Sequence, residues 1–416
     1  MIVNLSMNHP DFGNFRKTII GIGLLGLLFA APEVKAQTKE TAIKLDQSWS
    51  YISGPQRLVN EANRVNYLIG PEHSLGTRVN NFSDLKPMDA HDSDFLRFHL
   101  NADQVFDMNK TTTGPDFYIG KTEVSNTQYR EFIRDCIRQW MKENKPEVVK
   151  NYKDDSPKYI KAVHEWLRYD VKERFYRDTL RNYTWAELEM KMEYLDYSRI
   201  TWKGTAVYPN INAWLADFQY SYNEPMTRFY FNHPKYANYP VVGISQVQAT
   251  LFCEWYTHHK ANGFIYRIPT EQEWERAASV IAKKPSKKSS GSPVNNNYLR
   301  NSKGVYIANY HTAIGDFTRD GALYPATAES YFPNDAGCYN MQGNVAEWTC
   351  NVMQIGNEGS AVTGYIIKGG AWNLPAAACT IGSRTILPEG LSTSYVGFRL
   401  VAVPMRKYKP TGTPEF

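Results

Sequence analysis

The chain changes its pattern near residue 295, and this change constrains the fold more than any other feature of the sequence. Amphipathic segments with helical spacing precede that point, whereas Asn295 to Pro404 is rich in glycine, asparagine and short apolar runs. Helices followed by a loop-rich β region are typical of an α+β domain and not of alternating βαβ units. Because 42% of the residues are hydrophobic, the chain can bury a sizeable core.

Three segments carry signals for the start of a helix. "DFYIGKTEVSNTQYREFI" predicts a strand followed by a helix that begins at Ser125 or Asn126. "NYPVVGISQVQATLFCEW" predicts a short apolar strand and then a helix capped by Ser245. In "YRIPTEQEWERAA", Thr270 and Glu273 have the spacing of a capping box. These motifs place the helices ahead of the β region.

The amino terminus has the pattern of an export signal. Arg16 and Lys17 precede "TIIGIGLLGLLFAAP", an apolar run that is short for a membrane-spanning helix. We expect a signal peptide over residues 1–36, cleaved before Gln37, with a retained membrane anchor as the alternative. Since the first cysteine of the chain is Cys136, we expect no direct lipid anchor.

Two segments are expected to lie outside the main body of the domain. Residues 37–90 are polar with little periodicity and predict an N-terminal arm or linker, after which "FLRFHL" alternates as a strand. Residues 137–236 are rich in charge, tyrosine and tryptophan and predict a helical insertion. Its aromatic stripes either pack onto the main body or form a docking surface for another protein.

Charge and cysteine usage exclude several classes of function. The net charge of +5 is too small to indicate nucleic-acid binding, since neither a basic helix nor a zinc-finger spacing accompanies it. The basic run from Lys283 is interpreted as a solvated loop, with an anionic partner as the alternative. The five cysteines have no CxxC spacing, which argues against a structural zinc site or a redox pair. One or two disulfides are compatible with an exported protein.

The stretch "YNMQGNVAEWTCN" concentrates oxygen donors around a glycine. Asn340 and Glu347 offer side-chain oxygens, and Gly343 allows the backbone to turn so that carbonyl groups converge. Hard oxygen donors of this kind suit Ca²⁺ rather than zinc. The alternative is an Asn/Gly turn in which Glu347 is a cap or a salt-bridge partner.

Six motifs occur in the order and spacing of one known domain. They resemble the formylglycine-generating enzyme (sulfatase-modifying factor) domain: "KTEVSNTQYREF", "YPVVGISQVQATLFCEW", "YRIPTEQEWERAA", "GCYNMQGNVAEWT", "IIKGGAW" and "VGFRLV". The resemblance implies a loop-rich, C-type-lectin-like domain over residues 91–404, followed by a tail at 405–416. Within the insertion, Val207 to Gly243 resembles a segment of the GldK/PorK and GldJ proteins of gliding motility and type IX secretion.

The resemblance also implies two structural calcium sites. The first site would use the side chains of Asn309 and Asp320 with the carbonyl groups of Tyr310 and Ala322. The second would use the side chains of Asn340 and Glu347 with the carbonyl groups of Gly343 and Val345. The implied role of both ions is to tie irregular loops together.

The catalytic residues implied by the resemblance are incomplete. The family's copper-dependent oxidase uses two cysteines, of which Cys379 matches the second while Leu374 replaces the first. Ala371 and Pro375 stand at the positions of the family's neighbouring serine and histidine. Because one thiolate cannot form a two-sulfur Cu(I) site, we expect a pseudoenzyme that holds no copper.

Two functions of different classes follow from the resemblance. The favoured one is a non-catalytic periplasmic scaffold of a type IX secretion or gliding motility machinery, associated with the outer membrane through partners. Such a scaffold would bind other envelope proteins in a large oligomeric assembly. The alternative is an enzyme that modifies exported proteins, a formylglycine-generating-like oxidase with its active site relocated to Cys379 or an acidic residue. Carbohydrate binding rests on fold-level analogy alone.

Overall fold

The structure, a computed structural model, describes residues 45–54, 56–59, 65–68, 77–79, 106–112, 114–169, 179–216, 224–280, 299–301, 303–312, 318–355, 362–388 and 390–405. These residues belong to one compact unit, Leu45–Phe416. The predicted signal peptide, the strand at 95–100 and the basic run from Lys283 lie outside the described residues. Within the described ranges, no helix has the length and apolar character that a membrane crossing requires.

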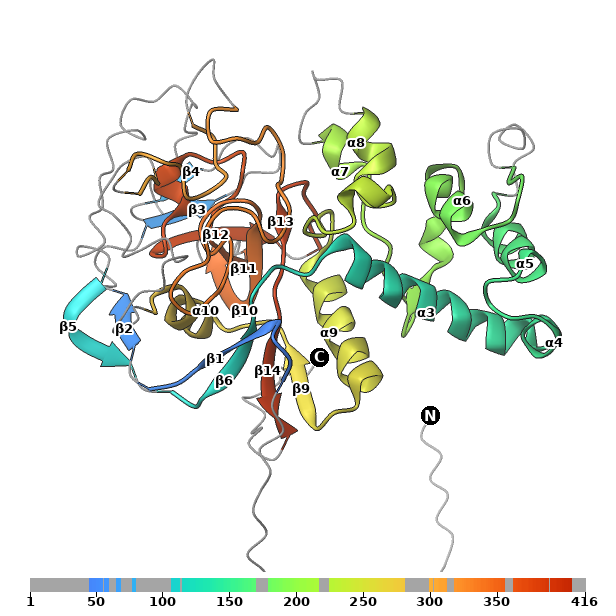
Figure 1. The fold of residues 1–416 in the computed structure, drawn as a ribbon, viewed down its shortest axis with the longest axis horizontal. Coiled ribbons are helices and arrows are strands. Elements are labelled where there is room, and N and C mark those ends of the chain that lie inside the picture. Colours follow the sequence, from blue (N-terminus) through green and yellow to red (C-terminus); the bar gives the residue numbers. More distant parts are fainter. Residues whose placement is uncertain are drawn as a thin grey trace, which may run out of the picture. The chain divides into compact units, whose positions relative to one another are not determined.

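A four-stranded antiparallel sheet gathers strands from distant parts of the sequence (Figure 1). Its order is β1 (Trp49–Ile52), β6 (Phe117–Gly120), β14 (Val401–Pro404) and β9 (Phe264–Arg267). The inward residues Phe117, Ile119 and Val401 are buried and belong to one apolar cluster with Trp274. The sheet therefore ties the N-terminal arm to the end of the domain.

A six-stranded mixed sheet forms the β-rich half. Its order is β13 (Val396–Gly397), β10 (Ala346–Ile355), β11 (Val362–Lys368), β12 (Ser383–Pro388), β3 (Val65–Leu68) and β4 (Thr77–Val79). β10, β11 and β12 pair antiparallel, while β12 pairs parallel with β3. Two-stranded ribbons join β2 (Gln56–Val59) to β5 (Phe106–Thr112) and β7 (Thr201–Trp202) to β8 (Thr205–Ala206). Together with the helices described below, these sheets confirm the predicted α+β class.

The predicted helix starts are confirmed at their caps. Helices α3 (Asn126–Asn144), α9 (Gln246–Lys260) and α10 (Glu271–Ala278) begin after Ser125, Ser245 and Thr270, each in a capping box. The short strand expected before Ser245 is wrong, because only an isolated bridge at Pro240 forms there. Proline lacks the N–H of a ladder, and Gly243 adopts a φ of +74°, so the segment continues as a loop.

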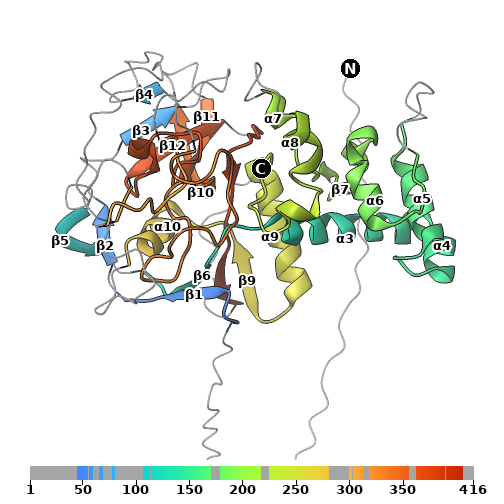
Figure 2. The ribbon, with the colours of Figure 1, turned by 45° about the horizontal axis from the view of Figure 1, so that its top comes forward.

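The insertion contains short helices, as predicted, and begins inside a longer one. The boundary predicted at residue 137 falls within α3, whose second half leads to the further helices (Figures 1 and 2). Those are α4 (Pro146–Asn151), α5 (Pro157–Leu167), α6 (Trp185–Met190), α7 (Ala213–Ala216) and α8 (Glu224–Phe229), with 3-10 turns at 192–194, 197–199 and 234–236. Their apolar faces belong to the same large cluster as α9, so the aromatic stripes pack inward.

The predicted arm is less irregular than its composition indicates. Residues 37–90 include β1, β2, β3 and β4, and β1 pairs residue by residue with β6, from Trp49 opposite Gly120 to Ile52 opposite Phe117. Strands of three or four residues are too short to show a clear alternation, so they acquire their structure from the partner strands.

Candidate functional site

Cys379 lies at the end of a 3-10 turn, Ala376–Cys379, in the position where the sequence predicts the remaining family thiol. The side chain is fully buried, and its Sγ contacts the carbonyl oxygens of Ala371 at 3.7 Å and Leu374 at 3.8 Å. The backbone before it wraps closely, because a Cβ at Gly370 would lie 2.6 Å from this sulfur. The structure thus brings positions 374 and 379 together, but with a leucine in place of one thiol.

The surroundings of Cys379 suppress thiol chemistry. Burial raises the pKa of the Cys379 thiol well above its ordinary value, so the sulfur remains protonated. Leu374 is 5% exposed and Ala371 is fully buried, and neither side chain can bind a metal. All five cysteines fall within the described ranges, where none forms a disulfide. Cys379 is therefore packed as a small buried hydrophobe.

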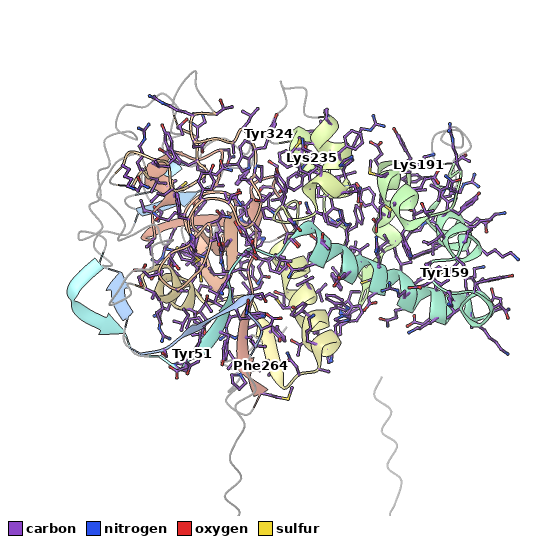
Figure 3. All side chains as sticks on the ribbon, in the orientation of Figure 1. Tyr51, Tyr159, Lys191, Lys235, Phe264 and Tyr324 are labelled. Atoms are coloured by element: carbon purple, nitrogen blue, oxygen red, sulfur yellow. The ribbon has the colours of Figure 1, made fainter. Side chains whose placement is uncertain are left out.

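An aromatic cluster covers the loop that precedes Cys379. Trp372 stacks on Trp214 of α7 with ring centroids 6.1 Å apart and meets Tyr324 edge-on at 5.4 Å. Figure 3 labels Tyr324 beside this junction of the insertion and the β-rich body, with Lys235 on the insertion side. Trp214 and Trp372 are 3% and 7% exposed. The insertion therefore packs against the loop that precedes Cys379.

The first predicted calcium set comes together in the structure. Asp320 accepts hydrogen bonds from the backbone N–H of Tyr310 at 2.7 Å and of Ala322 at 3.2 Å, so its carboxylate clamps both backbone segments. The side-chain nitrogen of Asn309 donates to the carbonyl of Tyr324 at 2.9 Å. The side-chain oxygen of Asn309, Oδ1, is buried and has no hydrogen-bond partner among the described residues. A buried side-chain oxygen without a donor fits a hard cation, which takes oxygen ligands.

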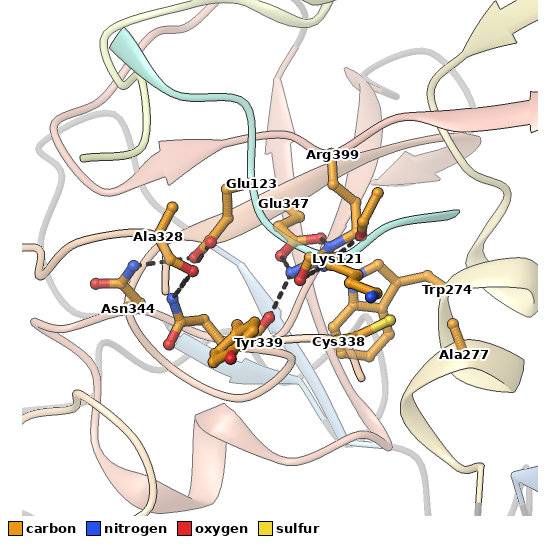
Figure 4. Close-up of polar contacts among 12 residues, drawn as sticks. Lys121, Glu123, Trp274, Ala277, Ala328, Cys338, Tyr339, Asn344, Glu347 and Arg399 are labelled. Carbon is orange, nitrogen blue, oxygen red and sulfur yellow. Dashed lines mark hydrogen bonds and ion pairs between the residues drawn. The ribbon is translucent and has the colours of Figure 1, made fainter. Parts of the chain in front are cut away.

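The second predicted set is arranged differently. Asn340 Oδ1 is also buried without a partner in the described part of the chain. Glu347, however, is fully buried in a forked ion pair with Arg399, at 2.6 Å from Nε and 2.5 Å from Nη2 (Figure 4). Trp274 Nε1 donates a further bond of 2.7 Å to Oε2. Glu347 thus takes the salt-bridge role that the sequence left open, while Gly343 and Val345 remain in the connecting turn.

Three residues of this centre were missed by sequence reasoning: Glu123, Asn344 and Arg399. Asn344 links the two loops, because its Oδ1 accepts from Asn309 at 3.2 Å and its Nδ2 donates to Glu123 at 2.9 Å. Burial raises the pKa of the Glu123 carboxyl to about 7, although the Arg399 guanidinium and the Asn344 amide oppose this shift. A charged residue within the apolar motif "VGFRLV" was the available signal for a buried ion pair.

Among the residues that the structure describes, no group of three or more His, Cys, Asp or Glu side chains could hold a metal ion. Each predicted calcium set contains a single carboxylate, so such a site would depend on amide and backbone oxygens. The predicted ligands therefore stay a prediction, favoured at the first loop (the described segments 309–310 and 320–322) by the unpaired Asn309 oxygen.

Comparison with known proteins places these features in a family context. The family model for the sulfatase-modifying factor enzyme 1-like domain matches residues 92–403. The inactive C-alpha-formylglycine-generating enzyme 2 of Bos taurus is 29% identical over 135 residues, covering 32% of this chain and 38% of the relative. The formylglycine-generating enzyme of Thermomonospora curvata is 26% identical over 187 residues, covering 40% and 57%. The chain thus spans less than two thirds of either relative.

Among solved structures, the crystal structure of CarF aligns with 85% of this chain and 97% of its own, at 15% identity and a TM-score of 0.38. An overlap of this quality carries no functional argument.

Proposed function

Since the chain belongs to the sulfatase-modifying factor enzyme 1-like domain family, we propose that it is a non-catalytic member that acts as a protein-binding scaffold. The observation that carries this proposal is the state of Cys379. The thiol is fully buried, protonated and next to Leu374, where a Cu(I) site would need a second sulfur. An oxidase of the family's kind could not form its two-sulfur metal site there.

Two further features favour loss of catalysis. Trp214 of the insertion stacks on Trp372, in the loop that leads to Cys379. One relative is named an inactive enzyme, whereas others are named formylglycine-generating enzymes, so similarity alone fits both classes. The geometry around the single buried thiol favours the first class over the alternative of a modifying enzyme.

The proposed scaffold acts in the periplasm, as a component of a type IX secretion or gliding motility machinery. The export signal and the resemblance of Val207–Gly243 to the GldK/PorK and GldJ proteins support this assignment. In the insertion, α4 has no buried residue, and it carries Glu147 and Lys150 exposed to solvent. A partner would therefore meet a charged helical surface whose apolar side is already packed against the domain.

The proposed structural ion is calcium, held at the first loop. Asn309 and Asp320 would supply side-chain oxygens, and Tyr310 and Ala322 their carbonyl groups. Such an ion would tie together two segments that contain little regular structure.

Chemical cross-linking of intact cell envelopes, followed by affinity purification and mass spectrometry, tests the scaffold. We expect other envelope proteins to be recovered with the wild-type chain and lost with Lys145→Glu/Lys150→Glu at the exposed ends of α4. The matched control, Lys260→Glu/Lys303→Glu, makes the same charge change at exposed positions outside the insertion. Recovery of the wild-type chain as an isolated monomer would contradict the proposal.

A Cys379→Ala variant separates the scaffold from the enzyme. A scaffold retains its partners and its secretion or gliding phenotype after this change, because the thiol only fills space. Loss of the phenotype with partners still bound would favour chemistry at Cys379.

A further inference from the structure

Glu347 is the one acidic residue of the second loop (residues 339–347), and both of its carboxylate oxygens accept hydrogen bonds from side chains. Arg399 donates to Oε2 from Nε at 2.6 Å and to Oε1 from Nη2 at 2.5 Å, and Trp274 donates to Oε2 at 2.7 Å. All three side chains are buried, with Arg399, Glu347 and Trp274 at 0% exposure. A metal ion at this carboxylate would have to share it with the guanidinium of Arg399, which already carries the balancing positive charge.

Arg399 is itself enclosed by oxygen atoms. Its Nη1 donates to the carbonyls of Gly120 at 3.0 Å and Lys121 at 3.3 Å, and its Nη2 also donates to the carbonyl of Tyr339 at 2.9 Å (Figure 4). With the two bonds to Glu347, every N–H of the guanidinium has an oxygen partner. One carboxylate and several main-chain carbonyls around a buried positive charge resemble the surroundings of a hard cation.

We propose that the Arg399 guanidinium is the resident cation of the second loop, so that this chain binds a divalent cation at the first loop only. A divalent ion at Glu347 would face a like charge from Arg399 and leave that guanidinium buried without its partner. Asn340 Oδ1 remains as a single neutral oxygen, which suits a water molecule. The inference rests on the calcium site proposed for Asn309 and Asp320.

The number of bound ions tests whether the chain binds a divalent cation at the first loop only. The full chain is treated with EGTA, re-equilibrated with Ca²⁺ and measured by isothermal titration and elemental analysis. We expect one tightly held calcium ion in the wild-type chain and none in Asp320→Asn. Two ions would overturn the role of Arg399. Absence of any ion would overturn the assignment to the first loop and the calcium part of the proposed function, whereas the scaffold role is judged separately by cross-linking.

Rescue of an Arg399 variant by calcium tests whether the guanidinium takes the place of a metal ion in the second loop. Arg399→Ala leaves Glu347 facing an oxygen-lined space, so millimolar Ca²⁺ should raise the thermal midpoint of this variant more than that of the wild-type chain. The extra rise should vanish in Arg399→Ala/Glu347→Gln. If the variant does not fold without calcium, its refolding yield with and without Ca²⁺ provides the same readout.

Arg384→Ala is the matched control for the rescue. Arg384 also forms a forked pair, at 2.5 and 2.7 Å to Glu271, but Glu271 keeps Lys368 as a positive partner at 3.3 Å. We therefore expect no extra calcium response in this variant. Equal responses of Arg399→Ala and Arg384→Ala would overturn the proposal.

Discussion

The carbonyl oxygen of Leu374 lies 3.8 Å from the sulfur of Cys379. The chain path that would place two thiols together is therefore retained, while one of the thiols is absent. If the proposed pseudoenzyme assignment holds, the side chains and not the backbone prevent copper binding here.

Restoring the missing thiol should restore soft-metal binding. We expect Leu374→Cys to take up Cu(I), because two neighbouring thiols form the donor set that this ion prefers. Uptake is measured by competition with a chromogenic Cu(I) chelator. Ala376→Cys, which adds a thiol elsewhere in the same turn, is the control. Tight copper binding by the wild-type chain would show that the pseudoenzyme assignment is mistaken.

The accessibility of the thiols should follow their burial. Cys350 is exposed and the other four cysteines are buried, so Ellman's reagent should modify a single thiol in the native chain and all five after denaturation. Trp214→Ala should make Cys379 reactive by uncovering the Trp372 loop, at a cost of about 3–5 kcal/mol in stability. Trp166→Ala, which removes a different stacked tryptophan, should leave Cys379 protected. Equal rates of Cys379 modification in Trp214→Ala and Trp166→Ala would contradict the protection of this thiol by Trp214.

The pH dependence of stability should include a contribution from Glu273. Burial alone would raise its pKa, but the Arg267 fork at 2.6 and 2.7 Å and the Thr270 N–H lower it overall. A carboxyl group whose pKa is lowered in the folded state stabilises the folded protein at pH values above its unfolded pKa, which is about 4.3. This stabilisation is lost as the pH falls through the folded-state pKa.

We therefore expect the free energy of unfolding of the wild-type chain to fall more steeply below about pH 5 than that of Glu273→Gln. Glutamine retains the ability to complete the capping box, so the comparison isolates the charge. Urea titrations at a series of pH values measure the difference. Parallel pH profiles would exclude Glu273 as a contributor.

Removal of calcium should weaken the wild-type chain through the first loop. With free ion at 100 times its dissociation constant, linkage gives about 2.7 kcal/mol of stabilisation, which EGTA should abolish. Differential scanning calorimetry should show a lower thermal midpoint for wild type in EGTA and no change for Asp320→Asn. If EGTA lowers the thermal midpoint of the wild-type chain and of Asp320→Asn equally, the ion binds elsewhere.

Local features of this fold could be predicted from the sequence, and long-range pairings could not. The caps at Ser125, Ser245 and Thr270 depend on residues three positions apart. The sequence predicted the caps at Ser245 and Thr270, and it left the first helix to begin at either Ser125 or Asn126. The pairing of β3 with β12 joins segments about 300 residues apart, from Ser383 opposite Val65 onward. Alternation within strands of four residues does not indicate which distant strand will be the partner.

The same division applies to the candidate site. Asn309 and Asp320 are close in sequence, and the family resemblance assigned them to one site. Arg399 reaches Glu347 from the far end of the domain, and Glu123 reaches Asn344 from its beginning. These long-range contacts decide whether a carboxylate pairs with a metal ion or with a guanidinium. Neither the spacing of residues nor the composition of the chain reveals them.

The position of β14 between β6 and β9 has a consequence for biosynthesis. The strand that fills the middle of this sheet, Val401–Pro404, is among the last parts of the domain to be synthesised. Until it arrives, β6 and β9 lack a shared neighbour and expose backbone groups that can pair with other chains. A chain cut before residue 401 should therefore be cleared by proteases or aggregate, however complete its earlier helices are.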